Sequence, residues 1–126
     1  MQVRLIDLEP RLRAVRPHLY AAIARVLDRG RFVLGEEVDR FESAFAALCG
    51  AEHAIGCASG SDALLLSLLS LGVGPGDQVI VPSLTFVSCA TAVTRLGADV
   101  VFADIDRKSL TLDPASVAEA AARCPQ

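Results

Sequence analysis

The stretch AIGCASGSDALLLSLLSLGVGPGDQVIVPSLTF, residues 54–86, says more about the fold than any other part of the chain. A short apolar run over residues 53–57 leads into the small-residue turn ASGSD, residues 58–62, and a leucine-rich segment that ends at Gly72 follows. A strand, a turn and a helix in this order aim free N–H groups and the positive end of the helix dipole at one point. The sequence therefore predicts an anion-binding turn.

The residue types in this turn suit a phosphate group. Small side chains let an anion reach main-chain donors, and Gly60 is expected to supply the conformational freedom that the turn needs. Ser59 and Ser61 offer hydroxyl donors. Simple capping of the helix by Ser61 or Asp62 is an equally good interpretation. Neither the GxGxxG fingerprint nor the GxxxxGK[ST] P-loop occurs, so the favoured ligand is not a nucleoside triphosphate.

Composition narrows the class of protein. The 126 residues are the length of one domain, and an apolar content of 52% suffices for a core. A net charge of −3, a single tyrosine and no tryptophan argue against a nucleic-acid surface. Arginines alternate with acidic residues near the start and precede no apolar stretch, so we expect a cytoplasmic protein without a signal peptide or a membrane span.

The cysteines show no metal-binding pattern. They form no CxxC pair, and neither histidine stands at a ligand spacing from them. We therefore predict no metal site, and interpret the cysteines as small buried hydrophobic residues in a reducing compartment. The residues concerned are Cys49, Cys57, Cys89, Cys124, His18 and His53.

Two amphipathic helices are predicted before the first strand, over residues 17–29 and 36–49. Each has apolar residues at helical spacing and is followed by a glycine, Gly30 or Gly50. The joint between them, residues 31–35, is apolar for a linker. We expect it to pack either on the core of this chain or on a partner subunit.

The rest of the chain alternates strands and helices. Strands are predicted over residues 53–57, 78–81 and 99–103, with helices after the turn and over residues 87–96. Asp113 followed by proline is a typical helix start, so a last helix is expected from there to about Arg123. This order predicts an α/β fold with a mainly parallel sheet, divided into N-terminal helices, residues 1–50, and strand–helix units, residues 51–126.

Four ordered blocks resemble one enzyme family. They are Gly35-x-x-Val38-x-x-Phe41-Glu42, HAIGCASGSDAL, GVGPGDQVIVPSLTFVS and GADVVFADIDRKSLTLDP. Together they are similar to the start of the pyridoxal-phosphate-dependent sugar aminotransferases of the DegT/StrS type. The resemblance implies the N-terminal portion of the large domain of a fold type I enzyme, with three α/β/α layers.

The resemblance also assigns a cofactor site. It implies that pyridoxal 5′-phosphate is held at the turn Ser59, Gly60, Ser61 and Asp62, chiefly by Gly60 and Ser61. The position of Phe86 implies an aromatic face stacked on the pyridine ring, which is worth about 0.5–1.5 kcal/mol beyond area burial. An ordinary core role for Phe86 is the alternative. Phe32 and its neighbours fall where family members approach the active site across a dimer interface, so a homodimer is implied.

No catalytic residue is expected in this chain. Family members are roughly three times as long, and their acidic partner of the pyridine nitrogen and their Schiff-base lysine fall outside the matching part. The only lysine, Lys108, lies in a polar loop and matches no catalytic motif. Asp104 and Asp106 match a structural loop rather than a site. We therefore expect a fragment, truncated within the large domain, and inactive alone.

The function implied for the full-length protein is transfer of an amino group from glutamate or glutamine to a nucleotide-linked keto sugar, for polysaccharides or antibiotic sugars. A non-catalytic phosphate- or cofactor-binding module, or a remnant that acts by association, is the alternative. Members that dehydrate instead of transaminating are not distinguished. In the resembling fold the strand at 53–57 pairs outside this chain, while those at 78–81 and 99–103 pair with each other. No stable, active monomer is expected.

Overall fold

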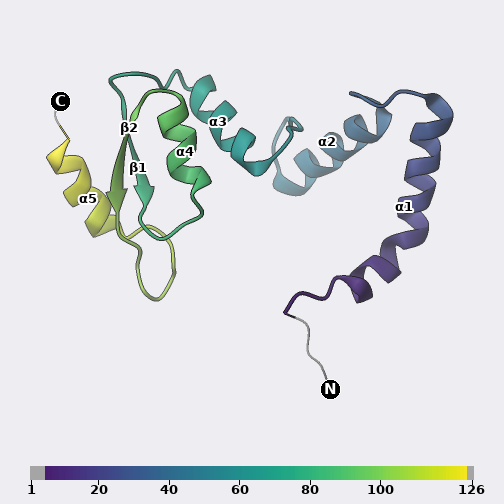
Figure 1. Cartoon of the computed structure of the whole chain (residues 1–126), viewed down its shortest axis with the longest axis horizontal. Coiled ribbons are helices and arrows are strands. Elements are labelled where there is room, and N and C mark those ends of the chain that lie inside the picture. The colour runs from purple at the N-terminus through teal and green to yellow at the C-terminus, as the bar shows by residue number, and fades with distance from the viewer. Residues whose placement is uncertain (1–4, 125–126) are drawn as a thin grey trace. The chain divides into compact units, whose positions relative to one another are not determined.

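The computed structural model describes residues 5–124, which divide between Gly56 and Cys57 into two compact units (Figure 1). The first unit contains helices α1 (Glu9–Arg29) and α2 (Glu36–Cys49). The second contains α3 (Gly60–Ser70), β1 (Gln78–Pro82), α4 (Ser88–Arg95), β2 (Asp99–Ala103) and α5 (Pro114–Arg123). No helix in the described range is long and apolar enough to cross a membrane.

Helix α2 has the bounds that the apolar spacing predicts, and α1 does not. Helix α1 begins at Glu9, eight residues before the predicted start at Pro17. The prediction was wrong because a proline fits the first turn of a helix but is also tolerated inside one, at the loss of one backbone hydrogen bond. Leu12 and Val15 extend the helical spacing of Leu19 and Ile23 past it. Gly30 and Gly50 adopt the left-handed conformation and end the two helices as predicted.

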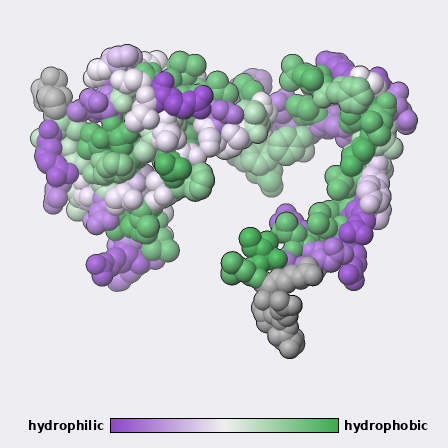
Figure 2. Space-filling model, in the orientation of Figure 1, coloured by the Kyte–Doolittle hydropathy of each residue, from purple (hydrophilic) through white to green (hydrophobic). Residues whose placement is uncertain are grey.

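The joint between these helices does not enter a core. Phe32, Val33 and Leu34 are all exposed, and Leu34 has a positive φ of 49°. Apolar side chains of both units remain at the surface, as Figure 2 shows. Within the first unit, the joint is therefore not packed on a core.

The second unit is built on a parallel pair of strands. β1 and β2 run side by side with Val79 opposite Val100 and Val81 opposite Phe102, so the pairing predicted for these segments is confirmed. Helices α4 and α5 flank this sheet, and α3 packs on α4 (Figure 1). The α/β class is confirmed by this arrangement of helices around a parallel sheet.

The core of this unit lies between the sheet and α4. Val93 is fully buried and meets Val81 and Ala98, with partly buried side chains packed around them. Gly97 makes the turn from α4 into β2 with a φ of 76°, and a Cβ there would lie 3.1 Å from the ring of Pro75. This turn closes the core from one end. The sheet and α4 thus form the packed core on which α3 lies through its contacts with α4.

The predicted strand over residues 53–57 does not form. This segment has no β-pairing in the part of the chain that is described, although Glu42 of α2 accepts a hydrogen bond from the Gly56 amide at 2.6 Å. The prediction was wrong for this chain because a strand exists only when its N–H and C=O groups meet a partner strand. An apolar run alone does not supply that partner.

Candidate functional site

The N-terminus of α3 carries the predicted turn. Its cap is Ser59, whose hydroxyl oxygen accepts a hydrogen bond from the Asp62 amide at 3.1 Å and donates to Asp62 Oδ2 at 3.0 Å. The main-chain oxygen of Ser59 accepts from the Ala63 amide. The expectation that Ser61 or Asp62 caps the helix is therefore wrong, because Ser59 fills that role.

Two amides remain available at this helix end. Within residues 5–124, neither the Gly60 N–H nor the Ser61 N–H has a hydrogen-bond partner. A Cβ added to Gly60 would meet no atom within 4 Å, so the space beside these amides is open. The helix dipole adds a partial positive charge at the same place. Main-chain donors, open space and dipole together fit an anion such as a phosphate.

Gly60 acts differently from the sequence prediction. It lies in the first turn of α3 and has no positive φ, so its conformational freedom is not what the turn uses. Its missing side chain leaves the amides accessible instead. The role predicted for Gly60 was wrong because the change of direction into α3 comes one residue earlier, at the cap residue Ser59, whose backbone is extended.

Ser61 connects α3 to the start of α4. Its hydroxyl oxygen lies 2.6 Å from the hydroxyl oxygen of Ser88, which is 8% exposed. Ser88 comes two residues after Phe86, so this contact ties the segment that carries Phe86 to the N-terminus of α3. Sequence reasoning missed Ser88, because nothing in the local pattern distinguishes it from any hydroxyl at a helix start.

Phe86 is 75% exposed in this chain. Phe86 therefore belongs to no core within residues 5–124, and its role at a cofactor stays a prediction. An exposed aromatic ring between a strand and a helix is a flat apolar surface open to a ligand. The structure thus places Phe86 and the free amides of α3 on neighbouring segments of one unit.

Charges near this site are arranged around Asp62. Arg95 of α4 has its Nη1 atom 3.7 Å from Asp62 Oδ1, and both side chains are partly exposed. This pair offsets the negative charge that Asp62 would otherwise place beside an anion. Asp62 is therefore compatible with the site without contacting the anion itself.

The acidic loop after β2 has a structural role. Asp104 Oδ1 accepts hydrogen bonds from the Ser83 hydroxyl at 3.2 Å and from the Ile105 amide at 2.9 Å. Asp106 accepts from the amides of Ser109 and Lys108, and the hydrogen bonds from Ser109 hold the pKa of the Asp106 carboxyl below its usual range. The carboxylates of Asp104 and Asp106 therefore stabilise the loop through these hydrogen bonds. The exposed Lys108 side chain lies in the same loop.

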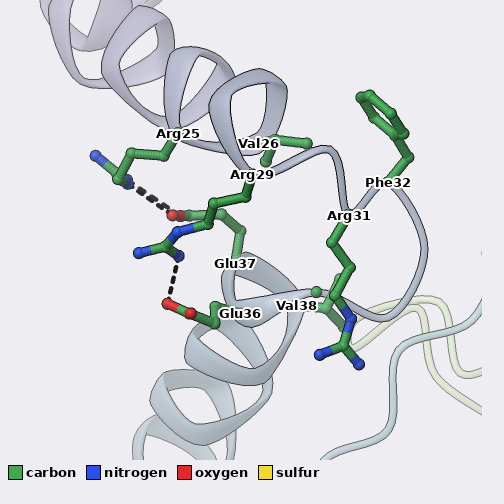
Figure 3. Close-up of a pocket in the computed structure, with 9 residues that line it drawn as sticks. Arg25, Val26, Arg29, Arg31, Phe32, Glu36, Glu37 and Val38 are labelled. Carbon is green, nitrogen blue, oxygen red and sulfur yellow. Dashed lines mark hydrogen bonds and ion pairs between the residues drawn. The ribbon is translucent and has the colours of Figure 1, made fainter.

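A second polar cluster surrounds a cavity of about 250 Å³ in the first unit (Figure 3). Arg25 donates two hydrogen bonds to Glu37, at 2.7 and 3.1 Å, and Arg29 pairs with Glu36. The hydrogen bond with Arg25 lowers the pKa of Glu37, and the same bond raises the pKa of Arg25. Because these charges satisfy one another, the cluster is an ion-pair network that joins α1 to α2. Phe32 points away from these pairs (Figure 3).

The cysteines are less buried than predicted. Cys49 and Cys57 are exposed, and Cys89 and Cys124 are partly exposed. The prediction of buried cysteines was wrong because the second unit buries little beyond the face shared by α4 and the sheet. Among residues 5–124, no group of three or more metal-ligating side chains comes together.

Comparison with known proteins adds independent findings. The model of the DegT/DnrJ/EryC1/StrS aminotransferase family matches residues 15–124. The chain is 47% identical over 119 residues to a dTDP-3-amino-3,4,6-trideoxy-alpha-D-glucose transaminase of Streptomyces venezuelae, which covers 94% of this chain and 31% of the relative. The chain thus spans about a third of the length of the curated relatives it matches.

Solved structures agree with this. The crystal structure of S. venezuelae DesV in complex with a ketimine intermediate superposes with a TM-score of 0.90 at 47% identity, over 94% of this chain and 32% of that one. A GDP-4-keto-6-deoxymannose-3-dehydratase with a trapped PLP-glutamate geminal diamine gives a TM-score of 0.73 at 35% identity, over 79% and 28%. The chain therefore has the fold of the corresponding part of these enzymes.

Proposed function

Because the chain belongs to the DegT/DnrJ/EryC1/StrS aminotransferase family, we propose that its protein transfers an amino group from glutamate or glutamine to a nucleotide-linked keto sugar, with pyridoxal 5′-phosphate as cofactor. The observation that carries this proposal is the open N-terminus of α3, linked through the Ser61–Ser88 contact to the segment that carries the exposed Phe86. Relatives whose names state transfer to a nucleotide-linked sugar support the choice of substrate class.

The residues of this chain have separate roles in that reaction. The amides of Gly60 and Ser61 and the Ser61 hydroxyl hold the phosphate, while Ser59 and Asp62 fix the helix end that presents these donors. Phe86 orients the ring by stacking on one face. The bound cofactor supplies the electron sink for chemistry at the amino carbon. No catalytic group is assigned to residues 5–124, and Lys108 takes no part.

The phosphate assignment is tested by replacing Gly60 with valine. Nothing within 4 Å obstructs a side chain there, so the variant should fold, but the added methyl groups would occupy the space that the phosphate needs. We expect the dissociation constant of pyridoxal 5′-phosphate to rise at least about tenfold, a loss of about 1.4 kcal/mol. The dissociation constant is measured by fluorescence titration with pyridoxal 5′-phosphate. The protein used is the whole polypeptide that the gene encodes.

A matched control is Ser70→Ala, which removes a hydroxyl from the other end of α3, where it bonds only to the Ser67 carbonyl oxygen. Its affinity should equal that of the unaltered protein. An unchanged affinity in Gly60→Val, with a native circular dichroism spectrum, would exclude the phosphate site. If the protein binds the cofactor but converts neither glutamate nor glutamine to the corresponding 2-oxo acid in a single turnover, it is a binding module and not a transaminase.

A homodimer is part of the proposal. The exposed apolar joint at Phe32, Val33 and Leu34 supports it, because contiguous exposed apolar side chains are typical of association surfaces. We expect light scattering to give twice the mass of one polypeptide, and the triple substitution of these residues by serine to shift the population toward monomer. A monomer at all concentrations would contradict this assembly.

A further inference from the structure

Ser88 is a buried polar residue near the proposed phosphate site, with no role assigned in it so far. It opens α4, is 8% exposed, and its hydroxyl oxygen lies 2.6 Å from that of Ser61. The two residues are 27 positions apart in the chain, so packing of α3 on α4 brings them together. The contact joins the anion site to the segment that begins with Phe86.

The burial of Ser88 favours one direction of this hydrogen bond, with Ser88 as the donor. Two hydroxyls 2.6 Å apart share one proton between them, and geometry alone allows either to donate. A buried hydroxyl hydrogen needs an acceptor, and within residues 5–124 the Ser61 oxygen is the side-chain acceptor that Ser88 contacts. If Ser61 donated instead, the hydroxyl hydrogen of the largely buried Ser88 would have no other acceptor among residues 5–124.

With Ser88 as donor, the hydrogen of Ser61 is free to point elsewhere. The oxygen of Ser61 then accepts from Ser88, which leaves the Ser61 O–H available to a ligand at the end of α3, where the Gly60 and Ser61 amides have no partner within residues 5–124. A hydroxyl that accepts one hydrogen bond becomes a stronger donor in the next, because consecutive bonds polarise each other. Two consecutive hydrogen bonds would therefore link the site, one from Ser88 to Ser61 and one from Ser61 to the anion.

We propose that Ser88 is a positioning residue for the phosphate: it donates to Ser61 and so orients the Ser61 hydroxyl toward the anion. This inference rests on the proposed function, since it requires a phosphate at the N-terminus of α3.

The test is a double-mutant cycle on the polypeptide expressed from its own reading frame, with two probes. Pyridoxal 5′-phosphate carries the anion and pyridoxal lacks it, so the ratio of their dissociation constants reports the phosphate contacts alone. For pyridoxal 5′-phosphate we expect Ser61→Ala to raise the dissociation constant about tenfold to a hundredfold, and Ser88→Ala about threefold to tenfold. Ser88→Ala should add nothing to Ser61→Ala, and neither should change pyridoxal binding.

Each result separates the two claims. If Ser61→Ala leaves pyridoxal 5′-phosphate affinity unchanged, the phosphate site and this inference both fail. If Ser61→Ala weakens binding but Ser88→Ala does not, or the two effects add fully, only the positioning role of Ser88 is overturned. If Ser88→Ala weakens pyridoxal and its phosphate equally, Ser88 supports packing and not the anion. Ser70→Ala is the control for loss of a hydroxyl from α3.

Discussion

Helix α1 buries none of its residues and α2 buries only Ala46, whereas the second unit encloses Val93 completely. The first unit joins its helices through ion pairs at the surface, as between Arg25 and Glu37. The second joins β1, α4 and β2 through apolar contacts. Exposed ion pairs contribute little to folding, while burial of apolar area is the main favourable term. We infer that the second unit is the more stable of the two, and that the proposed site is built on it for this reason.

The largest expected effect comes from Val93→Asp, which places an unpaired charge in the one core of the second unit. We expect a loss of roughly 4 kcal/mol or more, enough to abolish protection of the β1 and β2 amides. Hydrogen exchange followed by mass spectrometry measures it. The matched change Val33→Asp, on the exposed joint of the first unit, should leave these amides protected. Equal losses in both variants would show that the two units do not differ as described.

A smaller effect is expected from the helix caps, which also differ between the units. Neither α1 nor α2 has a side-chain cap, whereas in the second unit Ser59 caps α3 and Asp113 caps α5, and only α4 has none. Ser59→Ala should destabilise the second unit by about 1 kcal/mol, since it leaves the Asp62 amide unpaired. Denaturant unfolding gives the value, and Asp113→Ala is the comparison at the other cap. A change within error in both variants would mean that side-chain capping does not distinguish the units.

The ion pairs of the first unit should respond to pH and salt. Because Arg25 lowers the pKa of Glu37 in the folded state, the pair contributes its full stability above the ordinary glutamate pKa of about 4.3 and loses it as the pH falls through the lower folded value. Glu37→Gln should remove this dependence, and the difference from the unaltered chain should shrink at high salt. NMR titration of α2 amides measures it, with the exposed Glu52→Gln as control. A salt-independent loss would indicate packing instead of charge.

The smallest effect on stability is expected from Phe86→Ala, in the second unit but outside its core. An exposed residue should change the free energy of unfolding by no more than about 0.5 kcal/mol without cofactor, against about 3–5 kcal/mol for a buried phenylalanine. The affinity for pyridoxal 5′-phosphate should fall in the same variant. Comparing melting temperatures with and without the cofactor separates the two roles. A large loss in the cofactor-free protein would contradict the exposed position.

Local signals were sufficient where the structure is local. The bounds of α2 and of β2 and the start of α5 at Asp113 agree with the sequence, because spacing, caps and turn residues act within a few positions. The same reasoning failed for residues 53–57, whose strand depends on a distant partner. It also misplaced the start of α1, because proline is common at helix starts, whereas Pro17 lies inside the helix.

The sequence by itself determined that a helix follows the small-residue turn at 58–62, although not that Ser59 caps it, and that an aromatic residue follows β1. It also determined the family, through blocks of residues in a fixed order. Only the tertiary structure decided that Gly60 leaves space without using a special conformation, that Phe86 is exposed, and that Ser88 meets Ser61. The physical reason is range: caps and periodicity act between neighbours in the chain, whereas burial and a contact across 27 residues exist only after α3 and α4 pack together.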